Sequence, residues 1–242
     1  MRRIRIFVAY DGTNYCGWQI QPNGITIEEK LNKALNRLTG EDIRVIGASR
    51  TDSGVHALGN VAVFDTESPI PPERFSYALN QRLPEDIVVV KSDEVPLDWH
   101  PRYQDNISKT YEYHIYNAQM PNPLKTRYCT FVSFPLDIGA MREGAKYLIG
   151  AHDFVSFCNI RTNTQDTVRT VYDLTIEKKD CAENHRKWIL VQHGPHYRRC
   201  PDPGRQRVLY SRKSKRDSGS QSPYFRRGHS IAKRTGIGKN RL

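Results

Sequence analysis

The first ninety or so residues alternate between short apolar runs and amphipathic segments. Residues 4–10 alternate apolar and polar side chains, rich in β-branched and aromatic types, and predict a strand. Residues 27–38 carry apolar side chains at helical spacing behind Thr26 and Glu29, which have the spacing of a capping box. The remaining predicted elements are strands over 43–47, 59–65 and 86–91 and a helix over 72–82. The predicted order is therefore β-α-β-β-α-β.

A second unit with a similar pattern begins near residue 105. Strands are predicted over 109–116, 129–134 and 168–176, and a helix over 138–149. Strand, strand, helix, strand is again an α+β order, so we predict an α+β protein of two ferredoxin-like (RNP-like) halves with antiparallel sheets. The first domain is expected over 1–104 and the start of the second over 105–182. The second half still needs a long central strand and a closing helix.

The segment 183–242 does not offer that strand and helix in its composition. Apolar residues are sparse and aperiodic there, and Arg, Lys, Ser, Gly and Pro dominate, which is typical of a disordered tail. The net charge of +11 also belongs to this end: residues 181–242 hold 16 basic and 3 acidic residues, against 21 and 23 in the rest. The second half is thus expected to be incomplete and followed by an aberrant basic tail, and the overall charge says little about the body.

The chain shows no sign of a membrane or secretory protein. No apolar stretch is long enough to span a bilayer, and the N-terminus lacks a signal-peptide pattern. The five cysteines are scattered, odd in number and without C-x-x-C spacing, which favours reduced thiols. We expect a cytoplasmic protein.

The candidate chemistry lies in the polar connection 48–57 between two predicted strands. Arg50 and Asp52 stand two residues apart, and Gly54 lets the backbone turn. Loops held by a rigid sheet carry a disproportionate share of catalytic groups, so an acid beside a fixed cation is a plausible site. A solvated turn with an internal ion pair is the alternative from these residues alone.

The same run resembles a family signature. Residues 50–57 resemble the R-T-D-x-G-V-H-A motif of the bacterial tRNA pseudouridine synthase A family, in which the motif Asp is the nucleophile. Further motifs follow in the family's order: Tyr10-Asp11-Gly12-Thr13, Gly17-Trp18-Gln19, Lys109-Thr110-Tyr111-Glu112-Tyr113, His152-Asp153-Phe154 and Arg169-Thr170. The resemblance covers residues 1–180 and implies the pseudouridine synthase fold.

The resemblance implies conversion of uridine to pseudouridine, an isomerisation that needs neither a redox cofactor nor a metal. Asp52 would be the catalytic nucleophile, and Arg50 would keep it ionised and fill the space of the flipped base. Tyr111 would lie against the target base and handle a proton, although an alternating strand also allows a core aromatic there. His56, His152 and Asp153 are expected to shape loops.

The family also implies partners. The substrate would be the anticodon stem-loop of tRNA, at tRNA positions 38, 39 and 40, bound by a homodimer with a basic cleft. No membrane partner and no metal site are expected. Ligand-type residues at short spacing, His193, His196 and Cys200, are interpreted as a chance cluster in the tail.

The tail has a further interpretation through the genetic code. With suitable codons, residues 183–198 read one base later as R-I-T-G-N-G-F-L-Y-N-M-V-R-I-I, a strand of the type that the family presents there. Residues 199–220 continue as an amphipathic-helix pattern. We therefore expect the tail to be the family's C-terminal part in a shifted frame, with the slip between about 178 and 183. The rival hypothesis is a truncated or frameshifted, catalytically inactive homologue that only binds RNA.

Overall fold

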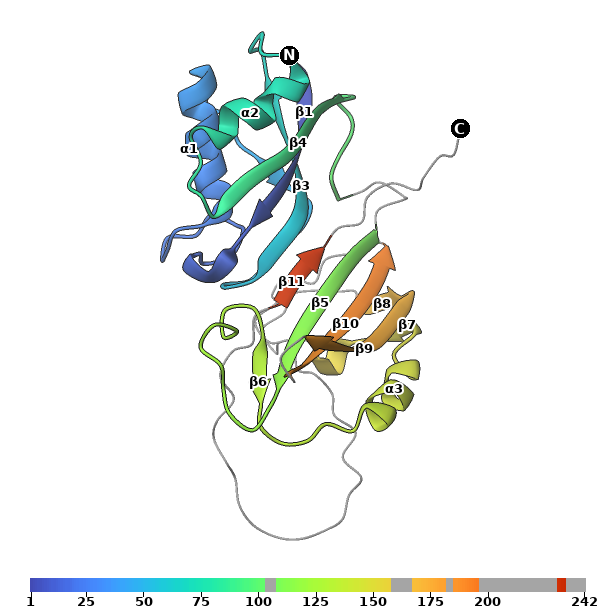
Figure 1. Ribbon diagram of the computed structural model, residues 1–242. Coiled ribbons are helices and arrows are strands. Elements are labelled where there is room, and N and C mark those ends of the chain that lie inside the picture. Colours follow the sequence, from blue (N-terminus) through green and yellow to red (C-terminus); the bar gives the residue numbers. More distant parts are fainter. Residues whose placement is uncertain (103–107, 158–166, 182–184, 196–229, 234–242) are drawn as a thin grey trace, which may run out of the picture.

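The computed structural model describes residues 1–102, 108–157, 167–181, 185–195 and 230–233. The first half has the predicted order of elements, with two short 3₁₀ turns added (Figure 1). Its elements are β1 (Arg2–Tyr10), η1 (Gly12–Asn14), α1 (Ile27–Thr39), β2 (Ile46–Gly47), β3 (His56–Thr66), η2 (Pro72–Arg74), α2 (Phe75–Asn80) and β4 (Ile87–Val95). The strands pair antiparallel in the order β4-β1-β3-β2.

The core of the first half lies between this sheet and the two helices. The alternation in β1 buries Ile4, Ile6 and Val8 completely, and they pack with Leu31 and Leu35 of α1. The predicted cap of α1 is present, because the Thr26 side chain accepts a hydrogen bond from the amide of the third helical residue. Burial of one apolar stripe per helix holds the sheet rigid beneath the loop described below.

The second half is built around β5. Its elements are β5 (Ser108–Asn117), β6 (Thr130–Val132), α3 (Ile138–Lys146), β7 (Gly150–Asp153), η3 (Val155–Phe157), β8 (Val168–Val171), β9 (Asp173–Cys181), β10 (His185–Pro195) and β11 (Ser230–Lys233). The described strands join both halves in one mixed sheet, β4-β1-β3-β11-β5-β10-β9, with β2 on β3 and β6 on β5; β7 and β8 form a separate pair. In Figure 1, β11 lies between β3 and β5 and bridges the halves.

Two predictions for the second half are wrong in detail. The single strand predicted over 168–176 is two strands, β8 and β9, separated at the half-exposed Tyr172, because β8 pairs with β7 while β9 pairs with β10. The sheet is not wholly antiparallel either. β6 runs parallel to β5 after the long connection 118–129, and β11 runs parallel to β3.

The expectation that nothing after residue 180 supplies a central strand is also wrong. β10 lies between β5 and β9 and pairs antiparallel with both, with Trp188 opposite Ile115 and Leu190 opposite Ile176. The short apolar run over 188–191 is enough to support a strand where both neighbouring strands offer backbone groups for pairing. The average composition of the whole tail does not indicate this strand. The predicted disorder of 196–229 and 234–242 lies outside the described residues, as does any closing helix there.

The described helices are short. None of them combines the length and the apolar character that a membrane span requires.

Candidate active site

The predicted catalytic run forms the loop 48–55, which connects β2 to β3 at the edge where the two halves meet. Asp52 is a half-buried residue, and its backbone carbonyl accepts a hydrogen bond from the amide of Val55 at 3.1 Å. Gly54 has a φ of 79°, in the left-handed region that glycine tolerates best. Asp52 therefore stands at the start of a tight turn.

Carbonyl groups of the loop are held by donors from the surrounding elements. Within the first half, the Trp18 amide donates to the Thr51 carbonyl at 3.0 Å, and the Asn60 amide group donates to the Ser49 carbonyl at 3.0 Å. The hydroxyls of Tyr10 and Thr51 share a hydrogen bond of 2.7 Å, and burial raises the pKa of the Tyr10 phenol. Tyr10 therefore stays protonated and keeps this bond.

The second half contributes a cation to the same loop. The ammonium group of Lys109, a buried residue of β5, donates to the carbonyl of Ala48 at 3.0 Å. Close by, the Arg102 guanidinium donates to the carbonyl of Gly47 at 2.8 Å. The bond from Lys109 ties the beginning of the loop to the second half, and the bond from Arg102 holds the strand residue just before it.

Two upstream motifs are explained by contact with this loop. A Cβ at Gly12 would lie 2.0 Å from the Val55 carbonyl oxygen, and a Cβ at Gly17 would lie 2.4 Å from the Thr51 carbonyl oxygen. Between them, the Tyr15 carbonyl accepts a hydrogen bond from the Gly54 amide at 3.2 Å. The motifs around residues 10–13 and 17–19 thus cradle the turn, a role that sequence analysis did not assign to them.

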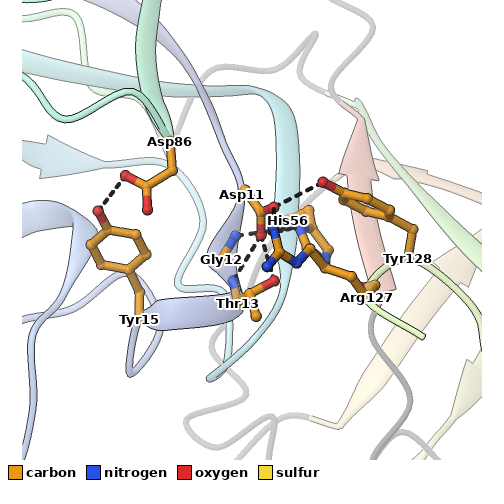
Figure 2. A network of polar contacts seen from close by, with 8 residues as sticks. All are labelled: Asp11, Gly12, Thr13, Tyr15, His56, Asp86, Arg127 and Tyr128. Carbon is orange, nitrogen blue, oxygen red and sulfur yellow. Dashed lines mark hydrogen bonds and ion pairs between the residues drawn. The ribbon is translucent and has the colours of Figure 1, made fainter. Parts of the chain in front are cut away.

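A polar network beside the turn joins the halves (Figure 2). Asp11 lies between His56, whose Nδ1 is 3.0 Å from its Oδ1, and Tyr128, whose hydroxyl donates to its Oδ2 at 2.9 Å. His56 is buried and is the first residue of β3, so the expectation that it shapes the loop agrees with its position. His152 and Asp153, expected in a loop, lie instead in β7.

Tyr111 lies half-buried on β5, across the sheet from the end of the loop. Ala232 of β11 pairs with Ala57 on one side and with Tyr111 on the other. Two strand spacings therefore separate Tyr111 from Ala57, or about 10 Å. Tyr111 comes from the second half, so the structure brings the predicted pocket tyrosine and the predicted nucleophile loop to the same level of one sheet.

Arg50 lies two residues before Asp52 in the same loop, and its side chain is exposed. An exposed guanidinium beside the turn is a group that an anionic ligand can reach.

The described part of the chain contains no cluster of three or more His, Cys, Asp or Glu residues that could hold a metal ion. His196 and Cys200 of the suspected chance cluster lie outside the described residues. The site consists of a carboxylate, a tyrosine and basic groups, which are side chains that can act as acids, bases or nucleophiles.

Comparison with known proteins defines the class to which this fold and loop belong. The family model described as tRNA pseudouridine synthase matches residues 6–104 and 145–192. The chain belongs to this family of tRNA-modifying enzymes, and the resemblance drawn from its motifs is confirmed. The matched region ends inside β10, so the similarity reaches beyond residue 180.

The chain is also similar to individual curated proteins of this family. It is 50% identical over 180 residues to tRNA pseudouridine synthase A of Thermoanaerobacter sp. (strain X514), covering 74% of this chain and 73% of that protein. It is 47% identical over 178 residues to the Brevibacillus brevis protein of the same name, covering 74% and 72%. With tRNA pseudouridine synthase A of Clostridium acetobutylicum it shares 44% identity over 194 residues, covering 80% and 77%.

Proposed function

We propose that this protein is an isomerase that converts uridine to pseudouridine in tRNA, with Asp52 as its nucleophile. One observation carries the proposal: the backbone of the loop 48–55, which contains Asp52, is hydrogen-bonded by residues of both halves of the molecule. The family match and the relatives named tRNA pseudouridine synthase A support the same reaction. A carboxylate carried by a loop with a bonded backbone, at a junction of two halves, suits a substrate base that must be held in place during the reaction.

The reaction follows from this arrangement. The Asp52 carboxylate attacks the flipped nucleoside, at the sugar or at the pyrimidine ring, and the bond between N1 of the base and C1′ of the ribose breaks. The base turns, its C5 bonds to C1′, the bond to Asp52 breaks and releases the carboxylate, and the proton on C5 is transferred to N1, so no atom is gained or lost. Tyr111 lies beside the base and handles the proton, while the exposed Arg50 occupies the place that the base leaves in the stem. The step needs no redox partner.

We further propose the finer assignments that the family suggests. The substrate is the anticodon stem-loop at tRNA positions 38, 39 and 40, and the enzyme is a cytoplasmic homodimer. The two halves are ferredoxin-like, which the strand order β4-β1-β3-β2 of the first half supports. RNA would be recognised mainly through shape and backbone contacts.

The test compares pseudouridine formation in an unmodified tRNA transcript for the wild type and Asp52→Asn. Loss of the nucleophile lowers the rate by more than about a thousandfold, while tRNA binding changes little, since the side chain keeps its size. Asp42→Asn removes an exposed carboxylate from the same half and serves as the matched control with unchanged activity. Activity that persists in Asp52→Asn would refute the assignment.

The second candidate is an RNA-binding homologue without catalysis. The 16 basic residues among positions 181–242, set against 3 acidic ones, favour it, because such a segment binds phosphate without sequence preference. In that case the wild type forms no pseudouridine, and its affinity for tRNA falls steeply with salt. Turnover by the chain as written, lost in Asp52→Asn, excludes this candidate.

A further inference from the structure

The polar network in Figure 2 connects the two halves of the molecule. Asp11 and His56 belong to the first half, while Arg127 and Tyr128 belong to the connection that precedes β6. The rings of His56 and Tyr128 lie with centroids 5.0 Å apart. The network is therefore a contact between two segments that are far apart in the sequence.

The hydrogen-bond partners of His56 indicate which of its ring nitrogens carry a proton. Its Nε2 lies 3.0 Å from the Arg127 carbonyl oxygen, so Nε2 carries a proton and donates. Its Nδ1 faces an acceptor, Asp11 Oδ1 at 3.0 Å, and a donor, the Gly12 amide at 3.3 Å. The protonated ring donates to both the carbonyl and the carboxylate, while the neutral ring accepts from Gly12. In either state the ring stays bonded to the second half.

The remaining contacts of the network are made to the carboxylate of Asp11. Its Oδ1 accepts hydrogen bonds from the Thr13 amide at 3.0 Å and the Thr13 hydroxyl at 2.5 Å, and its Oδ2 lies 3.6 Å from the Arg127 guanidinium. Burial raises the pKa of this carboxyl, but the hydrogen bonds from Thr13 and Tyr128 and the charge of His56 outweigh it and leave the pKa lowered. Asp11 is therefore an anion that binds the Tyr128 hydroxyl strongly.

The network also reaches the nucleophile through the backbone. His56 directly follows Val55, whose amide closes the turn on the Asp52 carbonyl and whose own carbonyl packs against Gly12. Holding Asp11 and His56 together therefore holds the end of the turn that begins at Asp52.

We propose that Asp11, His56 and Tyr128 form a clamp that positions the nucleophile turn when the connection 118–129 is docked on the first half. The clamp rests on the proposed function, since the group that it positions is Asp52. Its members touch no reacting atom. They act through the backbone of residues 52–56, and Tyr128 is a link through which the position of Asp52 depends on the second half.

The test uses Tyr128→Phe in the full chain. This variant removes the bond to Asp11 and keeps the ring against His56. Tyr113→Phe is the matched control, since its hydroxyl shares a bond of 2.7 Å with Thr130 wholly within the second half. Amide hydrogen exchange is measured at Gly54 and Val55, whose amides are hydrogen-bonded in the turn. The clamp predicts exchange about five- to tenfold faster in Tyr128→Phe only; equal exchange in the wild type and both variants overturns it.

Turnover supplies a second readout. In Tyr128→Phe, kcat for pseudouridine formation falls about tenfold while KM stays within about twofold, because the nucleophile is misplaced but the RNA surface is intact. An increase in KM alone would overturn the clamp and make Tyr128 an RNA contact. A wild type without turnover defeats the proposed function, and the exchange experiment then still decides whether the clamp exists.

Discussion

The two halves follow similar orders of strands and helices, but they differ in how much they bury. In the first half, α1 buries Ile27, Leu31, Ala34 and Leu35 in one continuous apolar cluster with the sheet. In the second half, α3 buries only Ala145 among its residues, and the apolar cluster of described side chains holds two buried residues, Ile115 and Val132. Among the described side chains, the first half thus forms the larger apolar cluster.

This difference is informative about function. The turn with Asp52 is built on the well-packed half, whereas the second half supplies side chains that reach over to it, such as Lys109 and Tyr128. A group that must be placed within a fraction of an ångström benefits from such a rigid support. The comparison leads to three tests.

The largest effect is expected from the reading frame of the second half. If the coding DNA read one base later from about codon 183 encodes R-I-T-G-N-G-F-L-Y-N-M-V-R-I-I, a protein with the frame restored after Lys179 gains apolar residues in a segment whose sequence has few of them. We expect a higher Tm and faster pseudouridine formation than in the chain as written. Thermal unfolding and product formation measured side by side are the check. A coding sequence without this peptide ends the frameshift hypothesis, and equal activity of both proteins shows that the basic tail suffices.

The next largest effect is expected when an apolar side chain is truncated in each half, which compares the two cores directly. Leu31→Ala removes a fully buried side chain from the first half and should lower the free energy of unfolding by about 3 kcal/mol. Ile138→Ala removes a half-buried side chain of α3 and should cost about 1 kcal/mol. Urea unfolding measures both. If the two costs prove equal, the second half is as well packed as the first and the contrast is wrong.

The smallest effect concerns an ion pair of the first half. Both oxygens of Asp93 accept hydrogen bonds from Arg5, at 2.7 and 2.6 Å. Burial raises the pKa of Asp93, but the bonds and charge of Arg5 outweigh it and leave the pKa lowered. The pair therefore stabilises the fold above the unfolded pKa of about 3.9, and this contribution is lost as the pH falls through the lower folded value.

Asp93→Asn should accordingly cost up to about 1 kcal/mol at pH 7 and little at pH 2.5, as measured by urea midpoints. Glu143→Gln in α3 is the matched control, since its partner Lys146 and the glutamate itself are both mostly exposed. A cost for Asp93→Asn that stays constant with pH would show that the ion pair contributes nothing.

The local structure of this protein can be predicted from its sequence. Period-two alternation identified β1 and β5, and the spacing of Thr26 and Glu29 placed the start of α1, because these signals depend on neighbours a few residues away. The motif at 50–57 likewise indicated the family that the comparisons confirm. Side-chain periodicity indicates which face of a helix or strand is buried, and a long motif indicates the chemistry of the segment that contains it.

Only the tertiary structure decided which segments meet. The bond between Tyr128 and Asp11 joins residues 117 positions apart, and β11 brings Ala57 and Tyr111 to the same level of the sheet. β10 forms from a tail whose composition argued against it, because β5 and β9 present backbone groups on both sides. Such contacts depend on the geometry of the whole sheet, since backbone pairing is available to almost any sequence and leaves little trace in side-chain pattern.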